Sequence, residues 1–239
     1  MAAELYRVGR IGSTMDRLHE LAEQGAPAGT AVLAEAQTGG RGSRGRAWDS
    51  APGGLWLSVL YRPPSSGGVE LLSLRLGLLV AAALEAGAQG LPVMLKWPND
   101  LMVHDRKLGG ILCEARWQGE SLAWVTAGLG LNVTNSIPDD LHLTATALRE
   151  HLSDASVEQV LPGILDALRW PVPQAERFTA EESRELQRRD WLRGRQLRAP
   201  LAGRAEGIAD DGALLVRTHE RLAAVRAGHV ELAQRSFTR

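Results

Sequence analysis

The chain has 239 residues, of which 44% are hydrophobic, 23% charged and 5% aromatic. This length allows one large domain or a domain with a small appendage, and the apolar content excludes global disorder. The net charge of −1 argues against a general nucleic-acid or membrane binder. Cys113 is the only cysteine, which excludes an intrachain disulfide and a multi-cysteine zinc site.

The sequence shows no secretory signal and no transmembrane segment. The first ten residues lack an apolar stretch, and the longest apolar run, 76–84, is far shorter than the roughly 20 residues that span a bilayer. We therefore expect a soluble protein of the cytoplasm.

Strands and helices are predicted to alternate up to residue 191. Apolar, β-compatible runs predict strands at 5–11, 30–36, 55–61, 93–97, 108–117 and 122–133. Helical patterns cover 15–23, 69–88, 157–168 and 175–191, the first of them N-capped by Ser13 or Thr14. The segment 37–54 is too rich in glycine and arginine for a regular element, and loops of that length are usually functional or disordered.

After residue 191 the pattern changes to short strand-like runs at 196–201, 203–208, 213–217, 221–227 and 229–232. Asp210-Asp211-Gly212 is typical of a hairpin turn between two of them. A β unit of roughly 45 residues is too small to be robust alone, so it should dock on the larger domain. We expect an α+β protein with domains at 1–191 and 192–239.

The basic residues are 25 arginines and only two lysines, Lys96 and Lys107. An ammonium is a compact point charge and a guanidinium is a planar fork, so the two do not replace each other at a tight site. In a chain that otherwise uses arginine, these two lysines are candidates for a specific role.

The loop 37–54 contains Gly40-Arg41-Gly42-Ser43-Arg44-Gly45, which matches the dinucleotide fingerprint G-x-G-x-x-G. We reject that interpretation because a Rossmann loop must open a helix, and 48–54 cannot. Arg41, Arg44 and Arg46 among glycines instead suit phosphate or carboxylate oxygens, and Trp48 can stack on a flat ring. The alternative is a solvated basic surface loop.

Three further clusters favour a polar ligand site. The segment Lys96-Trp97-Pro98-Asn99-Asp100 presents polar side chains at the end of a strand. Lys107 precedes a strand that starts with Gly109-Gly110, where glycine often marks the close approach of a ligand. In Gly128-Leu129-Gly130-Leu131-Asn132, alternate glycines leave one strand face flat enough for a ligand to lie on.

Together these motifs resemble those of the biotin protein ligases. They occur in the order of that family: Ser13-Thr14, the loop from Gln37 to Trp48, Lys96 to Asp100, Lys107 to Leu112, and Gly128 to Asn132. The resemblance covers nearly the whole chain. It implies a catalytic domain like that of class II aminoacyl-tRNA synthetases, with a mixed sheet flanked by helices, followed by a small SH3-type β-barrel.

The resemblance implies a two-step ligase. Biotin and ATP would give biotinyl-5′-AMP and pyrophosphate, and a lysine of a biotin carboxyl carrier protein, such as that of acetyl-CoA carboxylase, would then accept biotin. Magnesium is expected on the ATP phosphates, with no protein metal ligands assigned. Because the first predicted strand starts near residue 5, we expect no N-terminal helix-turn-helix and no specific DNA binding. A monomer or homodimer with no membrane partner is expected.

The resemblance also assigns roles to residues. Those for biotin are Ser13, Thr14, Met15, Gln37, Arg41, Gly42, Ser43, Lys107, Gly110 and Gly128. Those for ATP and the adenylate are Arg41, Arg44, Arg46, Trp48, Asn99 and Asn132. The catalytic candidates are Lys107, Arg41 and Asp100. The chemistry agrees, because the first step joins two anions and needs cations to offset their repulsion.

Two positions depart from the family pattern. Ser43 stands where a second arginine is common, and Met15 stands where asparagine is common, so Met15 offers only backbone hydrogen bonds. The alternatives are a lipoate or octanoate ligase of the same fold, a DNA-binding biotin sensor, and a non-catalytic anion-binding module. The segment 96–100 and the long loop favour biotin over lipoate.

Overall fold

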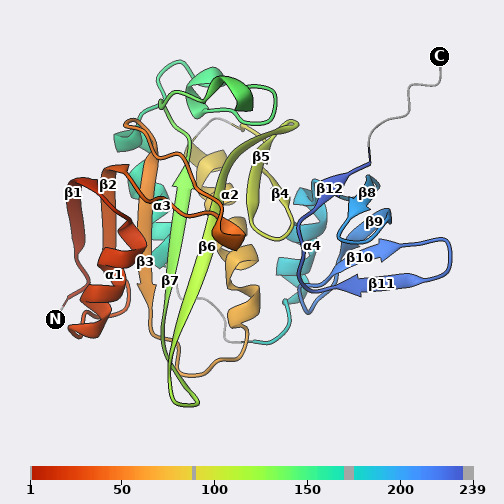
Figure 1. The fold of residues 1–239 in the computed structure, drawn as a ribbon, viewed down its shortest axis with the longest axis horizontal. Helices are drawn as coiled ribbons and strands as arrows, with labels where there is room; N and C mark the ends of the chain where they lie inside the picture. Colours follow the sequence, from red (N-terminus) through yellow and green to blue (C-terminus); the bar gives the residue numbers. More distant parts are fainter. Residues whose placement is uncertain (1, 88–89, 170–174, 234–239) are drawn as a thin grey trace.

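The computed structural model describes residues 2–87, 90–169 and 175–233. Within them, a seven-stranded sheet in the order β1-β2-β3-β7-β6-β5-β4 forms the centre of the molecule, and a smaller five-stranded sheet lies to one side (Figure 1). In the larger sheet β1 and β2 run parallel, and the other neighbours pair antiparallel.

The larger sheet and its helices comprise β1 (Leu5–Ile11), α1 (Thr14–Glu23), β2 (Ala31–Gln37), β3 (Leu55–Tyr61), α2 (Leu72–Gly87), β4 (Met94–Lys96), β5 (Asp100–Val103), β6 (Arg106–Gln118), β7 (Ser121–Leu131), α3 (Val157–Arg169) and α4 (Ala180–Arg189). The smaller sheet comprises β8 (Gln196–Ala199), β9 (Gly203–Ile208), β10 (Leu214–Arg217), β11 (Leu222–Val225) and β12 (Glu231–Leu232). Single 3-10 turns lie at η1 (Ser43–Gly45), η2 (Val69–Leu71), η3 (Asp139–Leu141) and η4 (Leu148–Glu150).

Most of the predicted elements are confirmed, and three are corrected. Strand β5 was not predicted, because its four residues directly follow a proline turn. The helix expected from residue 175 begins at Ala180, where Thr179 and Glu182 form a reciprocal capping box. The helix expected at 69–88 is α-helical only from Leu72, and residue 88 lies outside the described residues.

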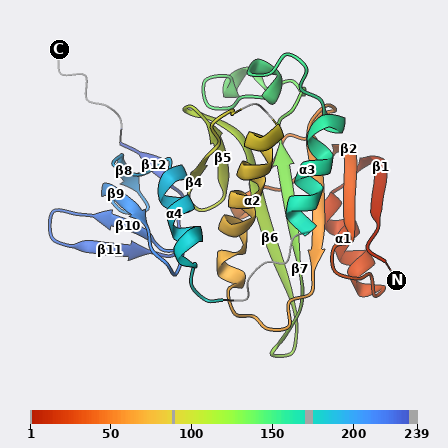
Figure 2. The same ribbon diagram turned by 180° about the vertical axis from the view of Figure 1, so that it is seen from behind.

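Two layers cover the larger sheet. Helices α2 and α3 pack on one face (Figure 2), where alternate residues of the central strands, such as Leu57, Ile111 and Leu129, enter the main core. Helix α1 and the loop between β2 and β3 cross the opposite face (Figure 1), which we call the front face. There α1 packs through Leu18 and a few neighbours in a smaller cluster that leaves much of β6 and β7 uncovered.

The smaller sheet is antiparallel in the order β11-β10-β9-β8-β12. Its buried residues, including Leu197 and Leu214, belong to the same hydrophobic cluster as Leu71, the last residue of η2 before α2. Trp97 ties the two sheets further, since its Nε1 donates a hydrogen bond to the carbonyl oxygen of Gly212 at 2.9 Å. The α+β class is confirmed. No pairing in the described ranges joins β11 to β12, the two edge strands, so backbone hydrogen bonds do not close the smaller sheet into the expected barrel.

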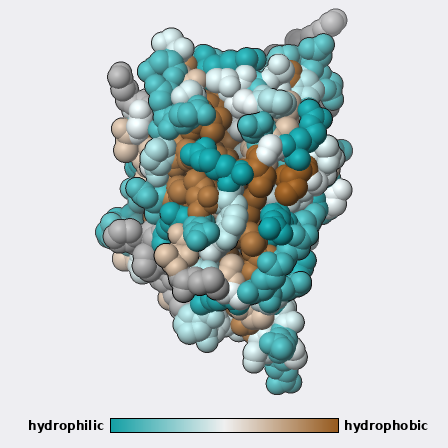
Figure 3. Space-filling view, turned by 90° about the vertical axis from the view of Figure 1, so that its left-hand side faces the viewer, coloured by the Kyte–Doolittle hydropathy of each residue, from teal (hydrophilic) through white to brown (hydrophobic). Residues whose placement is uncertain are grey.

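The surface adds two observations. No helix in the described part of the chain is long and apolar enough to cross a membrane. In the side view of Figure 3, which looks onto the β1 edge, hydrophobic residues gather near the middle of the face and hydrophilic residues surround them.

Candidate active site

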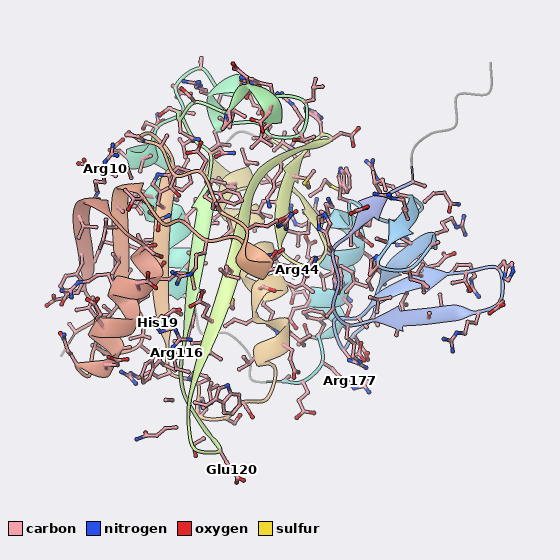
Figure 4. The ribbon with its side chains drawn as sticks, in the orientation of Figure 1. Arg10, His19, Arg44, Arg116, Glu120 and Arg177 are labelled. Carbon is pink, nitrogen blue, oxygen red and sulfur yellow. The ribbon has the colours of Figure 1, made fainter. Side chains whose placement is uncertain are left out.

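A cavity of about 640 Å³ opens on the front face, between the loop after β2, the strands β6 and β7, and the last segment of the smaller sheet. It gathers every predicted site residue except one: Ser13, Thr14, Met15, Gln37, Arg41, Gly42, Ser43, Arg46, Trp48, Asn99, Asp100, Lys107, Gly110, Gly128 and Asn132. The exception is Arg44, which is exposed on the loop in front of β6 (Figure 4) and adopts a left-handed backbone with φ of 61°.

Three rows of paired residues across β3, β7 and β6 build the front face here. They are Trp56–Gly130–Gly110, Ser58–Gly128–Leu112 and Leu60–Thr126–Glu114. Because side chains alternate along a strand, Gly128 and Gly130 face the cavity while their neighbours enter the core. The absent side chains let Trp48 lie against Gly130 and Met15 against Gly128, and we call the parts of the cavity beside these two contacts its first and second compartments.

The first compartment lies above Gly130 and is aromatic. A Cβ atom at Gly130 would lie 2.8 Å from Cε2 of Trp48, so only glycine lets this ring rest on the strand. The Nζ atom of Lys107 lies 4.8 Å from the centroid of the same ring. Nε1 of Trp48 is buried and has no hydrogen-bond partner within the described residues. This compartment offers a flat ring, a cation and an unused donor.

The second compartment lies above Gly128, where a Cβ atom would lie 2.7 Å from Sδ of Met15. The side that Thr14, Gln37 and Ser58 form is neutral and polar. Oε1 of Gln37 accepts hydrogen bonds from the backbone N of Thr14 at 2.9 Å and from its Oγ1 at 3.1 Å, and Oγ1 of Thr14 lies 2.8 Å from Oγ of Ser58. Nε2 of Gln37 donates to Ser50 at 2.9 Å. These contacts fix the orientation of the Gln37 amide. The polar groups around it suit a ligand with a compact polar ring.

Lys107 lies beside the first compartment, over Gly110, which pairs with Gly130. Its Nζ atom lies 2.5 Å from Oδ1 of Asp100, and both side chains are partly buried. Its backbone N donates to Thr144 at 2.7 Å and its carbonyl accepts from Thr146 at 2.9 Å, which ties the lysine to the loop after β7. A cation held from both sides in this way can act on an anion at a defined point.

Asn99 and Asn132, which were predicted to contact the nucleotide, form hydrogen bonds within the protein. Nδ2 of Asn99 donates to the carbonyl of Ile111 at 2.8 Å. Nδ2 of Asn132 donates to the carbonyl of Thr146 at 3.0 Å, and its Oδ1 accepts from Asn135 at 3.1 Å. Both asparagines line the cavity, but these hydrogen bonds hold the floor and the loop beside it. Their contact with a nucleotide stays a prediction.

The loop arginines differ from one another. Arg41 lines the cavity and pairs with Glu114 and Asp16, two carboxylates that the sequence analysis did not single out. Arg46 donates from Nη2 to Oγ of Ser43 at 3.2 Å. No motif indicated the partners of Arg41, because residue 114 is far from the loop in sequence and only the pairing of β6 brings it close.

The structure adds cavity residues that were not assigned to the site. Lys96 lies with Nζ 5.5 Å from the centroid of Trp191, and burial lowers its pKa although Asp100 raises it. The rarity of lysine in this chain and the polar segment 96–100 were the signals for it. His229 and Leu232 reach the cavity from the smaller sheet, and no feature of their sequence pointed to this.

Comparison with known proteins agrees with this geometry. The chain matches the biotin/lipoate A/B protein ligase family over residues 8–132, just over half of its length. The bifunctional ligase/repressor BirA of Bacillus spizizenii is 34% identical over 238 residues, which cover 93% of this chain and 72% of the relative. The biotin–(acetyl-CoA-carboxylase) ligase of Mycobacterium tuberculosis is 30% identical over 236 residues, covering 93% of this chain and 86% of that protein.

A solved structure shares the fold over nearly the whole length. Biotin protein ligase from Aquifex aeolicus in complex with biotin and ATP matches with a TM-score of 0.79 and 28% identity, covering 96% of this chain and 99% of that one. The family match over just over half of the chain and the relatives that align with 93% of it show that the chain belongs to the biotin/lipoate A/B protein ligase family.

Proposed function

We propose that the protein is a biotin–protein ligase that forms biotinyl-5′-AMP and transfers biotin to a carrier-protein lysine. The observation that carries this proposal is the pair of compartments over Gly128 and Gly130, with the Lys107 ammonium beside the Trp48 ring. The polar compartment suits the ring system of biotin and the aromatic one suits adenine. The relatives named as biotin ligases support the same choice.

In the first step, a carboxylate oxygen of biotin attacks the α-phosphorus of ATP. The bond from that phosphorus to the bridging oxygen breaks, and pyrophosphate leaves. Both reactants are anions, so a fixed cation must offset their repulsion and stabilise the charge that develops at phosphorus. We assign this task to Lys107, with Arg41 at the biotin end of the cavity.

In the second step, an uncharged lysine amine of the carrier attacks the acyl carbon of the adenylate. The bond from that carbon to the phosphate oxygen breaks, AMP leaves, and an amide forms. Asp100, which forms an ion pair with the ammonium of Lys107, is the carboxylate we assign to orienting the incoming lysine. An acyl-adenylate hydrolyses readily, so coverage by the loop after β2 protects it.

We assign no protein residues to magnesium. In the described ranges, no three histidine, cysteine, aspartate or glutamate side chains gather in an arrangement that could hold a metal ion. A magnesium ion would come as the counter-ion of the ATP phosphates, which is its common mode in nucleotide sites.

The finer assignments complete the proposal. Residues 1–191 form the catalytic unit and 192–239 the β unit, which contributes His229 to the cavity. The acceptor is a biotin carboxyl carrier protein, as in acetyl-CoA carboxylase, and the reaction takes place in the cytoplasm. The protein works as a monomer or homodimer without specific DNA binding.

The test is a transfer assay with the full chain, biotin, ATP, magnesium and a purified biotin carboxyl carrier domain. Intact-mass spectrometry should show one added biotinyl group on the carrier and none when its acceptor lysine is replaced by arginine. Lipoate in place of biotin should give no product. A carrier that gains lipoyl but not biotinyl groups would refute the proposal.

A further inference from the structure

Two carboxylates from different elements hold Arg41 in the cavity wall. Its Nε atom lies 3.1 Å from Oε1 of Glu114 and its Nη2 atom 3.4 Å from Oε2, so one edge of the guanidinium faces the carboxylate of β6. The remaining nitrogen, Nη1, lies 2.8 Å from Oδ1 of Asp16 in the first turn of α1. All three nitrogens of the guanidinium are therefore engaged.

The two carboxylates are not equivalent. The side chain of Asp16 is 59% exposed, whereas that of Glu114 is 22% exposed. A single contact to an exposed carboxylate contributes about 0–1 kcal/mol, and it exchanges readily with water or another acceptor. Contact with two nitrogens of one arginine edge is stronger and fixes direction as well as distance.

Glu114 also contacts His19, a buried residue of α1 whose ring bonds to residues of β7. Nδ1 of His19 accepts a hydrogen bond from Nε1 of Trp124 at 3.0 Å, so the neutral ring carries its proton on Nε2. Nε2 lies 3.1 Å from Oε2 of Glu114 and 3.1 Å from Oγ1 of Thr126. Trp124 therefore sets the tautomer that lets His19 donate to the glutamate.

These contacts keep the glutamate ionised. The hydrogen bond from His19 and the Arg41 guanidinium lower the pKa of Glu114 to about 2, although partial burial opposes them. Arg116 adds a weaker contact, with Nη2 at 3.8 Å from Oε2. Figure 4 shows His19 and Arg116 on the same lower half of the sheet.

This assembly closes the second compartment. Glu114 and Thr126 form the row directly after Gly128 and Leu112, so the anchored arginine stands at the end of the floor above Gly128. The side chain of Arg41 is 32% exposed and lines the cavity. Its Nη1 atom is the one nitrogen that can change partner without loss of the Glu114 contact.

We infer that Glu114, backed by His19 and Trp124, is a positioning residue that fixes Arg41 at the end of the biotin compartment, and that Asp16 is an exchangeable partner that yields Nη1 to an oxygen of bound biotin. The inference rests on the proposed function. It gives the two carboxylates opposite effects on binding. Glu114 strengthens biotin binding because it aims the donor, and Asp16 weakens it because it competes for the same donor.

The test measures the Kd of the full chain for biotin alone by isothermal titration calorimetry, with the melting temperature of each variant beside it. Glu114→Gln should raise the Kd at least 10-fold, since a neutral amide no longer holds both nitrogens. Asp16→Asn should lower the Kd about 2- to 5-fold, the value of one exposed ion pair. Glu206→Gln, which removes a carboxylate paired with Arg204 on β9, is the matched control and should leave the Kd unchanged.

The double variant separates positioning from a general structural effect. If Glu114 acts through Arg41, then adding Glu114→Gln to Arg41→Gln should change the Kd less than twofold, although Arg41→Gln alone weakens binding at least 10-fold. A structural role for Glu114 would instead give additive losses. Should Glu114→Gln fail to fold, Asp16→Asn in the Arg41→Gln background remains decisive, since its gain in affinity must vanish there.

Three results would overturn the inference. Tighter binding by both carboxylate variants would show a purely electrostatic effect on an anionic ligand. An unchanged Kd in Glu114→Gln, or additive losses in the double variant, would remove the positioning role. No binding of biotin by the unmodified chain would instead refute the proposed function. The three results above do not affect the proposed function, so the two kinds of failure are distinguishable.

Discussion

The ammonium of Lys107 lies 2.5 Å from the carboxylate of Asp100, beside the compartment that Trp48 lines. An incoming carboxylate or phosphate must therefore share this cation with an existing partner. A small ammonium can turn between two acceptors with little motion of its stem, whereas a planar guanidinium needs more room. The ring of Trp48, 4.8 Å from Nζ, limits that room.

Lys107→Arg should therefore slow adenylation at least about 100-fold, the cost of an approximately 1 Å misplacement of reacting groups. The melting temperature should change little, because the side chain is partly exposed at the cavity. Single-turnover formation of biotinyl-5′-AMP in a rapid-quench instrument measures the rate. Arg106→Lys, at the neighbouring exposed ion pair with Glu150, is the control and should keep the rate within about twofold. A normal rate in Lys107→Arg would show that arginine is tolerated here.

Gly128→Ala should weaken biotin binding selectively. The new Cβ lies 2.7 Å from Sδ of Met15, which is flexible and can move, so the chain still folds while the compartment narrows. Overpacking of about 1–3 kcal/mol corresponds to a rise in the biotin Kd of roughly 5- to 150-fold. Gly163→Ala, in open space on α3, should leave binding unchanged. Calorimetry with biotin decides, and equal affinities in the two variants would contradict the assignment.

Gly130→Ala should act on ATP instead. Its Cβ would meet Cε2 and Nε1 of Trp48 at 2.8 Å, and a rigid indole can yield only by leaving the strand. We expect the KM for ATP to rise about 10-fold or more by the same overpacking, with the Kd for biotin alone within about twofold of the original. Steady-state pyrophosphate release at saturating biotin gives the KM. A larger effect on biotin binding than on the KM for ATP would show that the two compartments are assigned to the wrong ligands.

Acid should remove the contribution of Glu114 to stability. Its pKa is about 2 in the fold against an ordinary value of 4.5, so the contribution is complete above about pH 4.5 and is lost as the pH falls towards 2. The groups facing it are His19, Arg41 and Arg116. Urea unfolding should find Glu114→Gln less stable by the order of 2 kcal/mol at pH 6, after screening is allowed for. The gap should shrink as the pH falls below 4.5 and should close only below about pH 2, and a constant gap would contradict this.

Local signals predicted the framework well. Strands β1 and β3 have the predicted bounds, because Gly12 directly follows the first strand and Pro63 and Pro64 lie just beyond the second. Strand β5 was not predicted, because Asp100–Val103 is short and its first residue also belongs to the turn motif. Helix α4 was extended too far back, because charged residues gave no clear periodicity and the Thr179 cap was overlooked.

The site was predictable only as far as its motifs reach. Short segments brought Thr14, Gln37, Lys107 and Gly128 together, since each motif sits at a strand or helix end on one face of the sheet. Glu114 and His19 carry no motif, and their roles depend on the pairing of β6 with β7 and on the packing of α1. Arg44, whose backbone adopts a left-handed turn, does not line the cavity, and its contact with the nucleotide stays a prediction.

ATP–pyrophosphate exchange tests the central claim most directly, since it reports adenylate formation without any carrier protein. With magnesium, ATP and labelled pyrophosphate, the full chain should incorporate label into ATP when biotin is present, and not with lipoate, octanoate or no acid. Lys107→Arg should reduce this exchange at least about 100-fold. Exchange that depends on lipoate or octanoate, or none with biotin, would contradict the account.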